Sequence, residues 1–302
     1  MKKLSQIAIL LFFIAGCCTS SLYTSEPESS KWQGPFFFVQ MADTQFGMFA
    51  ANMSFEKETE LFEKAISHAN RLKPAFVVIC GDMINKPGDE EQTKELFRIA
   101  HKLDKKIPLY WVSGNHDVGN RPTLENLEWY RKTFGKDWYA FHYGGCKFII
   151  INTTIIHRPD KVREEVEKQG EWLSGALKNA NNEKPIHTIV FQHHPLFLKD
   201  PQEKDGYFNI PKERRSRYLD LFKENNVTAV FAGHYHRNCY AKDGTMEMIT
   251  SGPVGQPLGE DPSGFRIVKL FKDHIEHKYY GLDAVPEMVR IQEEAITTDA
   301  HR

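Results

Sequence analysis

The sequence predicts an α/β protein, in which short buried strands alternate with longer helices in stacked layers. From Gly34 onward, short apolar runs rich in Phe, Val and Ile recur along the chain, as expected for buried strands. The segments between them are longer and carry apolar residues at helical spacing among charged ones. No internal repeat and no second hydrophobic unit is visible, which favours a single folded domain over residues 34–302.

The expected strands fall into two sets. Six apolar runs are expected to form the buried strands of the core, at 36–41, 75–80, 109–112, 147–152, 186–191 and 227–232. Three later segments have the pattern of antiparallel strands, at 247–250, 265–271 and 275–280. Lys272 and Asp273 separate the last two, where a hairpin turn is expected.

Five amphipathic segments are expected to be helices, at 54–71, 89–103, 123–134, 162–179 and 211–224. Ser54 can cap the first of them, because a serine hydroxyl accepts a hydrogen bond from a free backbone N–H. Pro211 suits the first turn of the last one, where no backbone N–H is needed. A further short helix is expected at 284–296.

Charge and composition narrow the class of partner. The chain has 302 residues, of which 41% are hydrophobic, so it contains ample material for a core. Its formal net charge is −1, whereas nucleic-acid-binding proteins usually carry a basic excess. No nucleic-acid partner is therefore expected.

The first residues have the pattern of an export signal. Lys2 and Lys3 precede an unbroken apolar run at 7–15, which is too short to span a bilayer comfortably. The run ends in Ile-Ala-Gly-Cys, which resembles the lipobox of bacterial lipoproteins with Cys17 as the acylated residue. A secretory signal cleaved nearby is the alternative.

These features divide the chain into three parts. Residues 1–17 are expected to be a signal peptide that ends in the lipobox cysteine, and residues 18–33 a flexible tether rich in Ser and Glu. The folded domain occupies residues 34–302. The protein is accordingly expected to be exported and held at the membrane of the cell envelope by lipid on Cys17, or to be secreted.

The remaining cysteines give little sign of chemistry. Five cysteines are present, at positions 17, 18, 80, 146 and 239, without a Cys-x-x-Cys pair or a tight framework. Cys80 and Cys146 border apolar runs and are expected to be small core residues.

Polar clusters follow five of the expected strands. They are Asp43-Thr44-Gln45, Gly81-Asp82, Gly114-Asn115-His116-Asp117, His193-His194-Pro195 and Gly233-His234-Tyr235-His236. Ligands of α/β proteins bind at the carboxyl ends of strands, so these side chains can converge on one point. Their carboxylate, amide and imidazole groups suit a divalent cation of the first transition row.

In this order, the clusters resemble the motifs of the calcineurin-like metallophosphoesterases. That family has Asp-x-His, Gly-Asp, Gly-Asn-His-Asp/Glu, His-x-Pro and Gly-His-x-His, and the resemblance extends from Phe36 to about Tyr280. Gln45 departs from the pattern, because most members have His there. The Asp-x-Gln-Phe-Gly start is similar to a subgroup described as protein serine/threonine phosphatases, and so are the segments 207–209 and 233–238.

The resemblance implies a site for two divalent metal ions, with Mn, Fe, Mg and Zn as the candidates. One ion would be held by Asp43, Gln45 and His236, the other by Asn115, His193 and His234, and Asp82 would bridge both. Two such ions can clamp the oxygens of a phosphoryl group. A non-ligating role for Gln45 stays open.

The resemblance also implies two catalytic residues. His116 would contact the phosphate and protonate the leaving oxygen, a common task for imidazole. Asp117 would accept a hydrogen bond from the His116 ring and raise its basicity.

Other basic residues near these motifs are not expected to bind metal. His194 should face away from His193, because adjacent residues of an extended segment point to opposite sides. Arg237 would either touch the substrate or form a surface salt bridge. A solvated helix face is the expected setting of Arg214, Arg215 and Arg217.

The implied fold is a four-layer αββα sandwich of two mixed β-sheets. The implied function is metal-dependent hydrolysis of a phosphoester, with a phosphomonoesterase acting on phosphoprotein or small phosphates as the leading hypothesis. A phosphodiesterase acting on small or lipid diesters is one alternative. A non-catalytic metal-binding module is the other, although every motif here retains a plausible donor.

Overall fold

The computed structural model describes residues 31–291. The expected signal peptide, Cys17 and most of the expected tether lie outside the described residues. Within residues 31–291, no helix combines the length and the apolar character needed to cross a membrane.

The first of two sheets contains the strands that lead into the first three polar clusters. Its strand order is β11-β10-β1-β2-β3, with β1 parallel to β2 and β2 to β3, and with β1–β10 and β10–β11 antiparallel. The bounds are Phe36–Met41 for β1, Val77–Cys80 for β2, Leu109–Val112 for β3, Gly264–Leu270 for β10 and Ile275–Gly281 for β11. The expected hairpin around Lys272 and Asp273 is confirmed.

The second sheet has the order β4-β5-β6-β7-β9-β8. The four central strands β5, β6, β7 and β9 are parallel to one another. The edge strand β4 is antiparallel to β5, and the edge strand β8 is antiparallel to β9. The bounds are Tyr139–Tyr143 for β4, Cys146–Ile150 for β5, Thr188–Phe191 for β6, Ala229–Ala232 for β7, Cys239–Asp243 for β8 and Met246–Thr250 for β9. Both sheets are therefore mixed.

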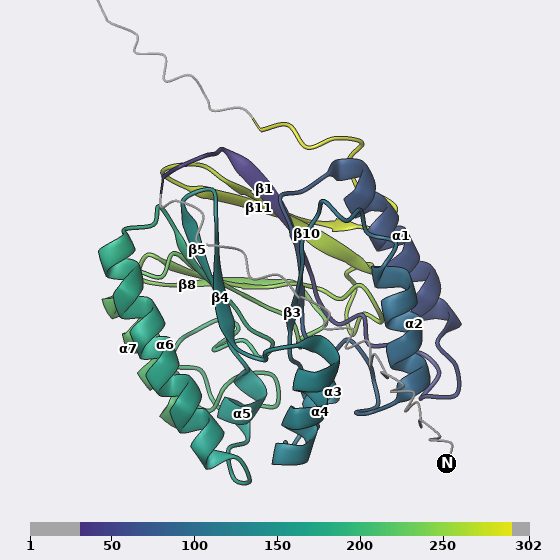
Figure 1. Cartoon of the computed structure of the whole chain (residues 1–302), viewed down its shortest axis with the longest axis horizontal. Coiled ribbons are helices and arrows are strands. Elements are labelled where there is room, and N and C mark those ends of the chain that lie inside the picture. The colour runs from purple at the N-terminus through teal and green to yellow at the C-terminus, as the bar shows by residue number, and fades with distance from the viewer. Residues whose placement is uncertain (1–30, 292–302) are drawn as a thin grey trace, which may run out of the picture.

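Helices cover the outer faces of the two sheets. Figure 1 shows the strands in the middle, with α1 and α2 on one side and α6 and α7 on the other. The bounds are Glu56–Leu72 for α1, Glu90–Ala100 for α2, Asn115–Val118 for α3, Leu124–Phe134 for α4, Thr153–His157 for α5, Arg163–Glu183 for α6 and Lys212–Glu224 for α7. The predicted four-layer αββα sandwich is confirmed.

The alternation of side chains along β1 explains why the sheets stack. Phe38 points between the sheets, where its ring centroid lies 5.5 Å from that of Phe191 and 5.7 Å from that of Phe231. Val39 belongs to the separate apolar cluster that includes Phe62 of α1. Because successive residues of a strand face opposite sides, one strand can supply both cores. Cys80 belongs to the inter-sheet core, as predicted.

Several expected elements differ from the structure. The edge strands β4 and β8 and the short helices α3 and α5 were not expected. Helix α1 begins after Phe55, whose side chain makes no capping hydrogen bond, so the Ser54 cap is wrong. Pro211 is the N-cap of α7 and precedes its first turn. Residues 284–291 form bends and irregular backbone, so the helix expected at 284–296 is absent from the described part of that range. Strand β9 is antiparallel to β8 but parallel to β7.

Candidate metal centre

Five loops bring the predicted site residues to one edge of the sandwich. Each loop follows a strand at its carboxyl end: β1 and β2 lead to Asp43 and Asp82, β3 leads into α3, and β6 and β7 lead to His193 and His234. The two sheets face each other, so loops from both can contribute to a shared site.

The backbone at these loops is strained. A left-handed φ, rare for residues other than glycine, occurs at Asp43 (50°), Gln45 (40°), Asp82 (50°), His234 (67°) and His236 (53°). Such conformations persist only where the surroundings enforce them, and they gather at functional sites. Half of the ten non-glycine residues with positive φ in residues 31–291 are predicted ligands, which supports a functional role for these loops.

Two motif glycines allow the loops to approach closely. A Cβ at Gly114 would lie 2.1 Å from Asp82 Oδ1, and one at Gly233 would lie 2.6 Å from Asp43 Oδ2. Neither distance is compatible with a side chain. The glycines of these motifs therefore leave room for the carboxylates.

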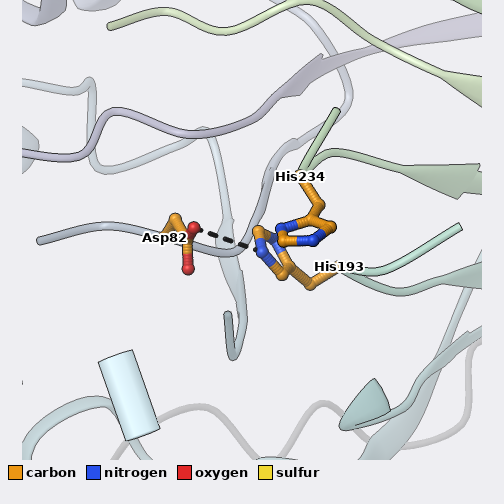
Figure 2. A group of neighbouring side chains, drawn as sticks. All are labelled: Asp82, His193 and His234. Atoms are coloured by element: carbon orange, nitrogen blue, oxygen red, sulfur yellow. Dashed lines mark ion pairs between the residues drawn. The ribbon is translucent and has the colours of Figure 1, made fainter. Parts of the chain in front are cut away.

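One group of donors comprises Asp82, His193 and His234. A donor atom from each lies within 4.8 Å of the others, and all three residues are buried. Figure 2 shows the Asp82 carboxylate directed toward the His193 ring, with the His234 ring alongside; Asp82 Oδ2 lies 3.3 Å from His193 Nε2. The Asn115 side-chain oxygen also lies 2.9 Å from His193 Nε2, so it belongs to the same group.

A second group comprises Asp43, Asp82 and His236, again within 4.8 Å of one another and buried. Asp43 Oδ1 lies 3.5 Å from His236 Nε2. The Asp43 carboxylate accepts a hydrogen bond from the backbone N–H of His234, whose nitrogen lies 3.1 Å from Oδ1 and 3.0 Å from Oδ2. The two groups share Asp82, which is the residue predicted to bridge two ions.

Backbone carbonyls fix which ring nitrogen of each histidine faces the centre. The pairs are His193 Nδ1 with Cys80 O (2.8 Å), His236 Nδ1 with Gln256 O (2.6 Å) and His234 Nε2 with Tyr207 O (3.2 Å). A carbonyl accepts only, so the nitrogen that faces it carries the proton, and the other nitrogen is a free donor for a cation. The centre thus presents Nε2 of His193 and His236 and Nδ1 of His234.

Gln45 fits a cation as well. Its Nε2 donates to Asn85 Oδ1 at 3.1 Å, whereas its Oε1 is buried and has no hydrogen-bond partner within the protein. A buried polar oxygen without a partner is costly, and a metal ion would satisfy it. Asn115 is arranged similarly, because its Nδ2 donates to Asn120 Oδ1 at 2.9 Å and leaves the oxygen toward His193.

The electrostatics of the group depend on a charge pair. Burial alone raises the pKa of Asp82, but the positive charges of His193 and His116 lower it below its usual value. Burial lowers the pKa of His193, but Asp82 outweighs this effect and raises it to about 9. A cation can bind only neutral imidazole, so metal affinity should weaken as the pH falls and protons compete for His193.

His116 lies at the rim of this centre. Its backbone N–H donates to Asp82 Oδ1 at 2.8 Å, and its ring Nδ1 donates to the Asn85 carbonyl at 2.7 Å. The ring is only partly buried, and its Nε2 is the nitrogen left to exchange a proton with a substrate.

Asp117 does not contact the His116 ring, so that part of the prediction is wrong. Its carboxylate accepts hydrogen bonds from the backbone N–H groups of Gly114 (2.7 Å), Met83 (2.9 Å) and Ile84 (3.3 Å). Burial, together with the nearby charge of Asp82, raises the pKa of Asp117 to about 7. Asp117 therefore ties the loops after β2 and β3 together, and the partner of His116 is the Asn85 carbonyl.

Three other basic residues near the motifs lie in different surroundings. His194 belongs to neither donor group and stacks on His157, with ring centroids 4.7 Å apart, although it also lies 4.2 Å from the His234 ring. Arg237 donates to the Leu258 carbonyl and lies over the Tyr235 ring. Arg215 is fully buried, so the expectation of a solvated arginine face is wrong for it.

Sequence reasoning missed the residues that orient the ligands. Asn85, Asn120 and Gln256 belong to no motif used above, and two of the contacts are made by backbone carbonyls, which carry no residue-specific signal. Tyr207 lies in a segment that resembles the phosphatase subgroup, and the structure places its carbonyl against His234.

The layers, the five loops and the paired donor groups define a protein of the dinuclear phosphoesterase type. The family model for calcineurin-like phosphoesterases matches residues 38–238, and the chain belongs to that family. It is therefore a phosphoester hydrolase, of a family whose members use divalent metals.

A curated relative agrees with this assignment, and solved structures share the fold. The chain is 40% identical over 285 residues to the human serine/threonine-protein phosphatase CPPED1, covering 89% of this chain and 90% of that protein. A purple acid phosphatase from yellow lupin shares the fold with a TM-score of 0.64 at 17% identity, over 86% of this chain and 53% of that one. A dimetal phosphatase from Danio rerio gives a TM-score of 0.59 at 18% identity, over 82% and 97%.

Proposed function

We propose that this chain is a phosphomonoesterase that removes phosphate from serine or threonine side chains of proteins or from comparable alkyl phosphates. The observation that carries the proposal is the pair of buried donor groups that share Asp82. The similarity to a serine/threonine-protein phosphatase over most of both chains supports the substrate class.

The proposal gives each residue a task. Asp43, Gln45 and His236 would hold one ion, Asn115, His193 and His234 the other, and Asp82 both. Bound ions would supply positive charge that binds the phosphoryl oxygens and activates water. His116 would bind the phosphate and donate a proton to the departing oxygen, with its ring held by the Asn85 carbonyl.

Asp82→Asn tests the two-ion assignment. The amide keeps the shape of the carboxylate but removes its charge and one of its two ligand oxygens. We expect metal analysis of the variant to give less than the wild-type content, with activity nearly abolished. Full metal content together with full activity would refute the bridging role.

A substrate screen tests the reaction class. Purified protein reloaded with Mn, Fe, Mg or Zn would be assayed against phosphoserine and phosphothreonine peptides, small alkyl phosphates, and small or lipid diesters. Preference for diesters would favour a phosphodiesterase, and no turnover with any metal would favour a non-catalytic metal-binding module.

We also propose that the protein is exported and anchored at the cell envelope through lipid on Cys17. The support is the short apolar run that ends in Ile-Ala-Gly-Cys. Cys17→Ala should move the protein out of the membrane fraction or block its processing. Mass spectrometry that finds an unacylated N-terminus at another residue would favour secretion instead.

A further inference from the structure

Gln92, on helix α2, is the starting point of a chain of four amide side chains that ends at the metal centre. It is buried, and its Oε1 accepts hydrogen bonds from the backbone N–H groups of Asn85 and Lys86, both at 3.1 Å. A backbone N–H can only donate. The oxygen of Gln92 must therefore face these two groups, and its NH₂ must face away from them.

Asn52 receives the next contacts. The Gln92 NH₂ donates to Asn52 Oδ1 at 2.9 Å, and the NH₂ of Asn85 donates to the same oxygen at 2.9 Å. Asn52 thus acts as an acceptor on both sides. Because the NH₂ of Asn85 is directed to Asn52, the oxygen of Asn85 is left on its other side.

Gln45 is the last member. Its NH₂ donates to Asn85 Oδ1 at 3.1 Å, so its own Oε1 points elsewhere and is the buried oxygen without a partner. Each amide in the chain can accept on one side only if its NH₂ lies on the other. The two backbone N–H groups at Gln92 therefore determine which atom Gln45 presents to an ion.

We propose that Gln92 is a positioning residue for the metal ion held by Asp43, Gln45 and His236, and that it acts through Asn52 and Asn85. We call the four residues Gln92, Asn52, Asn85 and Gln45 the amide relay. This inference rests on the proposed function, because it requires an ion at Gln45. An oxygen facing the ion binds it, whereas an NH₂ there would repel it.

Gln92→Glu should invert the amide relay. A carboxylate still accepts from the two backbone N–H groups but cannot donate to Asn52, so Asn52 must turn its NH₂ toward position 92. Asn85 and then Gln45 must turn in response, which places the Gln45 NH₂ toward the ion. Changes to residues behind metal ligands typically cost about 10–100-fold in affinity. We expect the dissociation constant of one of the two Mn²⁺ sites to rise by that factor, while the other site keeps its affinity.

Asn52→Asp is the matched control. It adds the same charge in the same region, but Asn52 only accepts in the amide relay, so a carboxylate preserves every contact. Its Mn²⁺ affinity should equal or exceed that of the wild type. An equal loss in Asn52→Asp and Gln92→Glu would show that charge, and not orientation, is responsible, and would overturn the proposal.

A double variant gives the sharper test. In the Gln45→Glu background both side-chain atoms of residue 45 are oxygens, so turning the group has no consequence for the ion. Gln92→Glu should then not raise the Mn²⁺ dissociation constant, although it raises that constant in the wild-type background. A glutamate at position 45 cannot donate to Asn85 Oδ1, and it gains the NH₂ of Asn85 as a donor once Asn85 turns. The measurement is calorimetric titration of metal-free protein with Mn²⁺, with the thermal midpoint of the metal-free form recorded for each variant.

The outcomes separate the relay from the site itself. If Gln45→Met binds Mn²⁺ as the wild type does, Gln45 is not a ligand and the proposed site is wrong. If Gln45→Met loses affinity but Gln92→Glu does not, only the relay is wrong. Where Gln92→Glu fails to fold, Asn85→Leu removes the acceptor of Gln45 and Asn85→Asp retains it. Equal Mn²⁺ affinity in these two variants would overturn the proposal.

Discussion

Replacing Gly114 by Ala should disable the metal centre through the carboxylate of Asp82. Gly114 has an ordinary extended backbone, with φ −107° and ψ 176°, so the substitution introduces no backbone strain of its own. The new methyl carbon would lie 2.1 Å from Asp82 Oδ1 and 2.2 Å from the Asp82 nitrogen. Any effect of the variant is therefore a steric effect on Asp82.

The size of the effect follows from these distances. Carbon and oxygen atoms in contact are about 3.5 Å apart, so Asp82 or the loop after β3 must move by more than about 1 Å. The hydrogen bond from the His116 N–H to Asp82 Oδ1, at 2.8 Å, cannot survive such a shift. A displacement of about 1 Å typically costs about 100-fold in rate. We expect kcat/KM to fall at least that far, and the metal content to fall with it.

Gly175→Ala is the matched control for this experiment. Gly175 lies within α6, and a Cβ there would meet no atom within 4 Å. This control should keep full activity and gain about 0.5–1 kcal/mol of stability, since alanine favours helix over glycine. The assay is kcat/KM with a phosphomonoester, together with metal analysis and thermal unfolding. Wild-type metal content and activity in Gly114→Ala would refute the view that Asp82 must occupy its observed position.

Three further predictions concern other parts of the site. His116→Ala should slow hydrolysis of an alkyl phosphate by about 10²–10⁴-fold but slow a nitrophenyl phosphate much less, because nitrophenolate can leave unprotonated. Equal losses in kcat/KM on both substrates would show that His116 is not the general acid. Gln45→His should shift the activating metal from manganese, magnesium or iron toward zinc, and an unchanged activation profile across a metal series would argue against ligation by Gln45. Arg215→Met should lower the free energy of unfolding by about 3 kcal/mol, measured by denaturant titration, because the buried Arg215 donates to the backbone carbonyls of Leu196 and Glu203. A loss below about 1 kcal/mol would show that these hydrogen bonds contribute little.

The sequence was most informative about the buried strands. The expected bounds of β1 and β3 agree with the structure, because short continuous apolar runs are typical of strands that are covered on both faces. The edge strands β4 and β8 were missed because their residues are mostly half-buried or exposed and mix polar with aromatic side chains. Tertiary pairing, and not local pattern, determines such strands.

The order of motifs also predicted which residues meet at the end of the sheets, but not what orients them. Asp117 is adjacent to His116 in sequence, yet its carboxylate accepts from the backbone N–H of Gly114 and from backbone N–H groups of the loop after β2. Arg215 has the sequence context of an exposed helix face, yet it is buried beneath the loop at 196–203. These outcomes depend on how distant loops pack, which residue spacing does not encode.

The strained loops at the candidate metal centre have a consequence for how the protein responds to its surroundings. Five residues there hold left-handed backbone conformations, and each costs on the order of 1 kcal/mol. Ions that bind only the folded form would offset this cost by mass action, so the folded fraction would depend on the free-metal concentration. In metal-poor surroundings the protein would then lose activity and resistance to proteases together, and the supply of ions would set the lifetime of the enzyme as well as its rate.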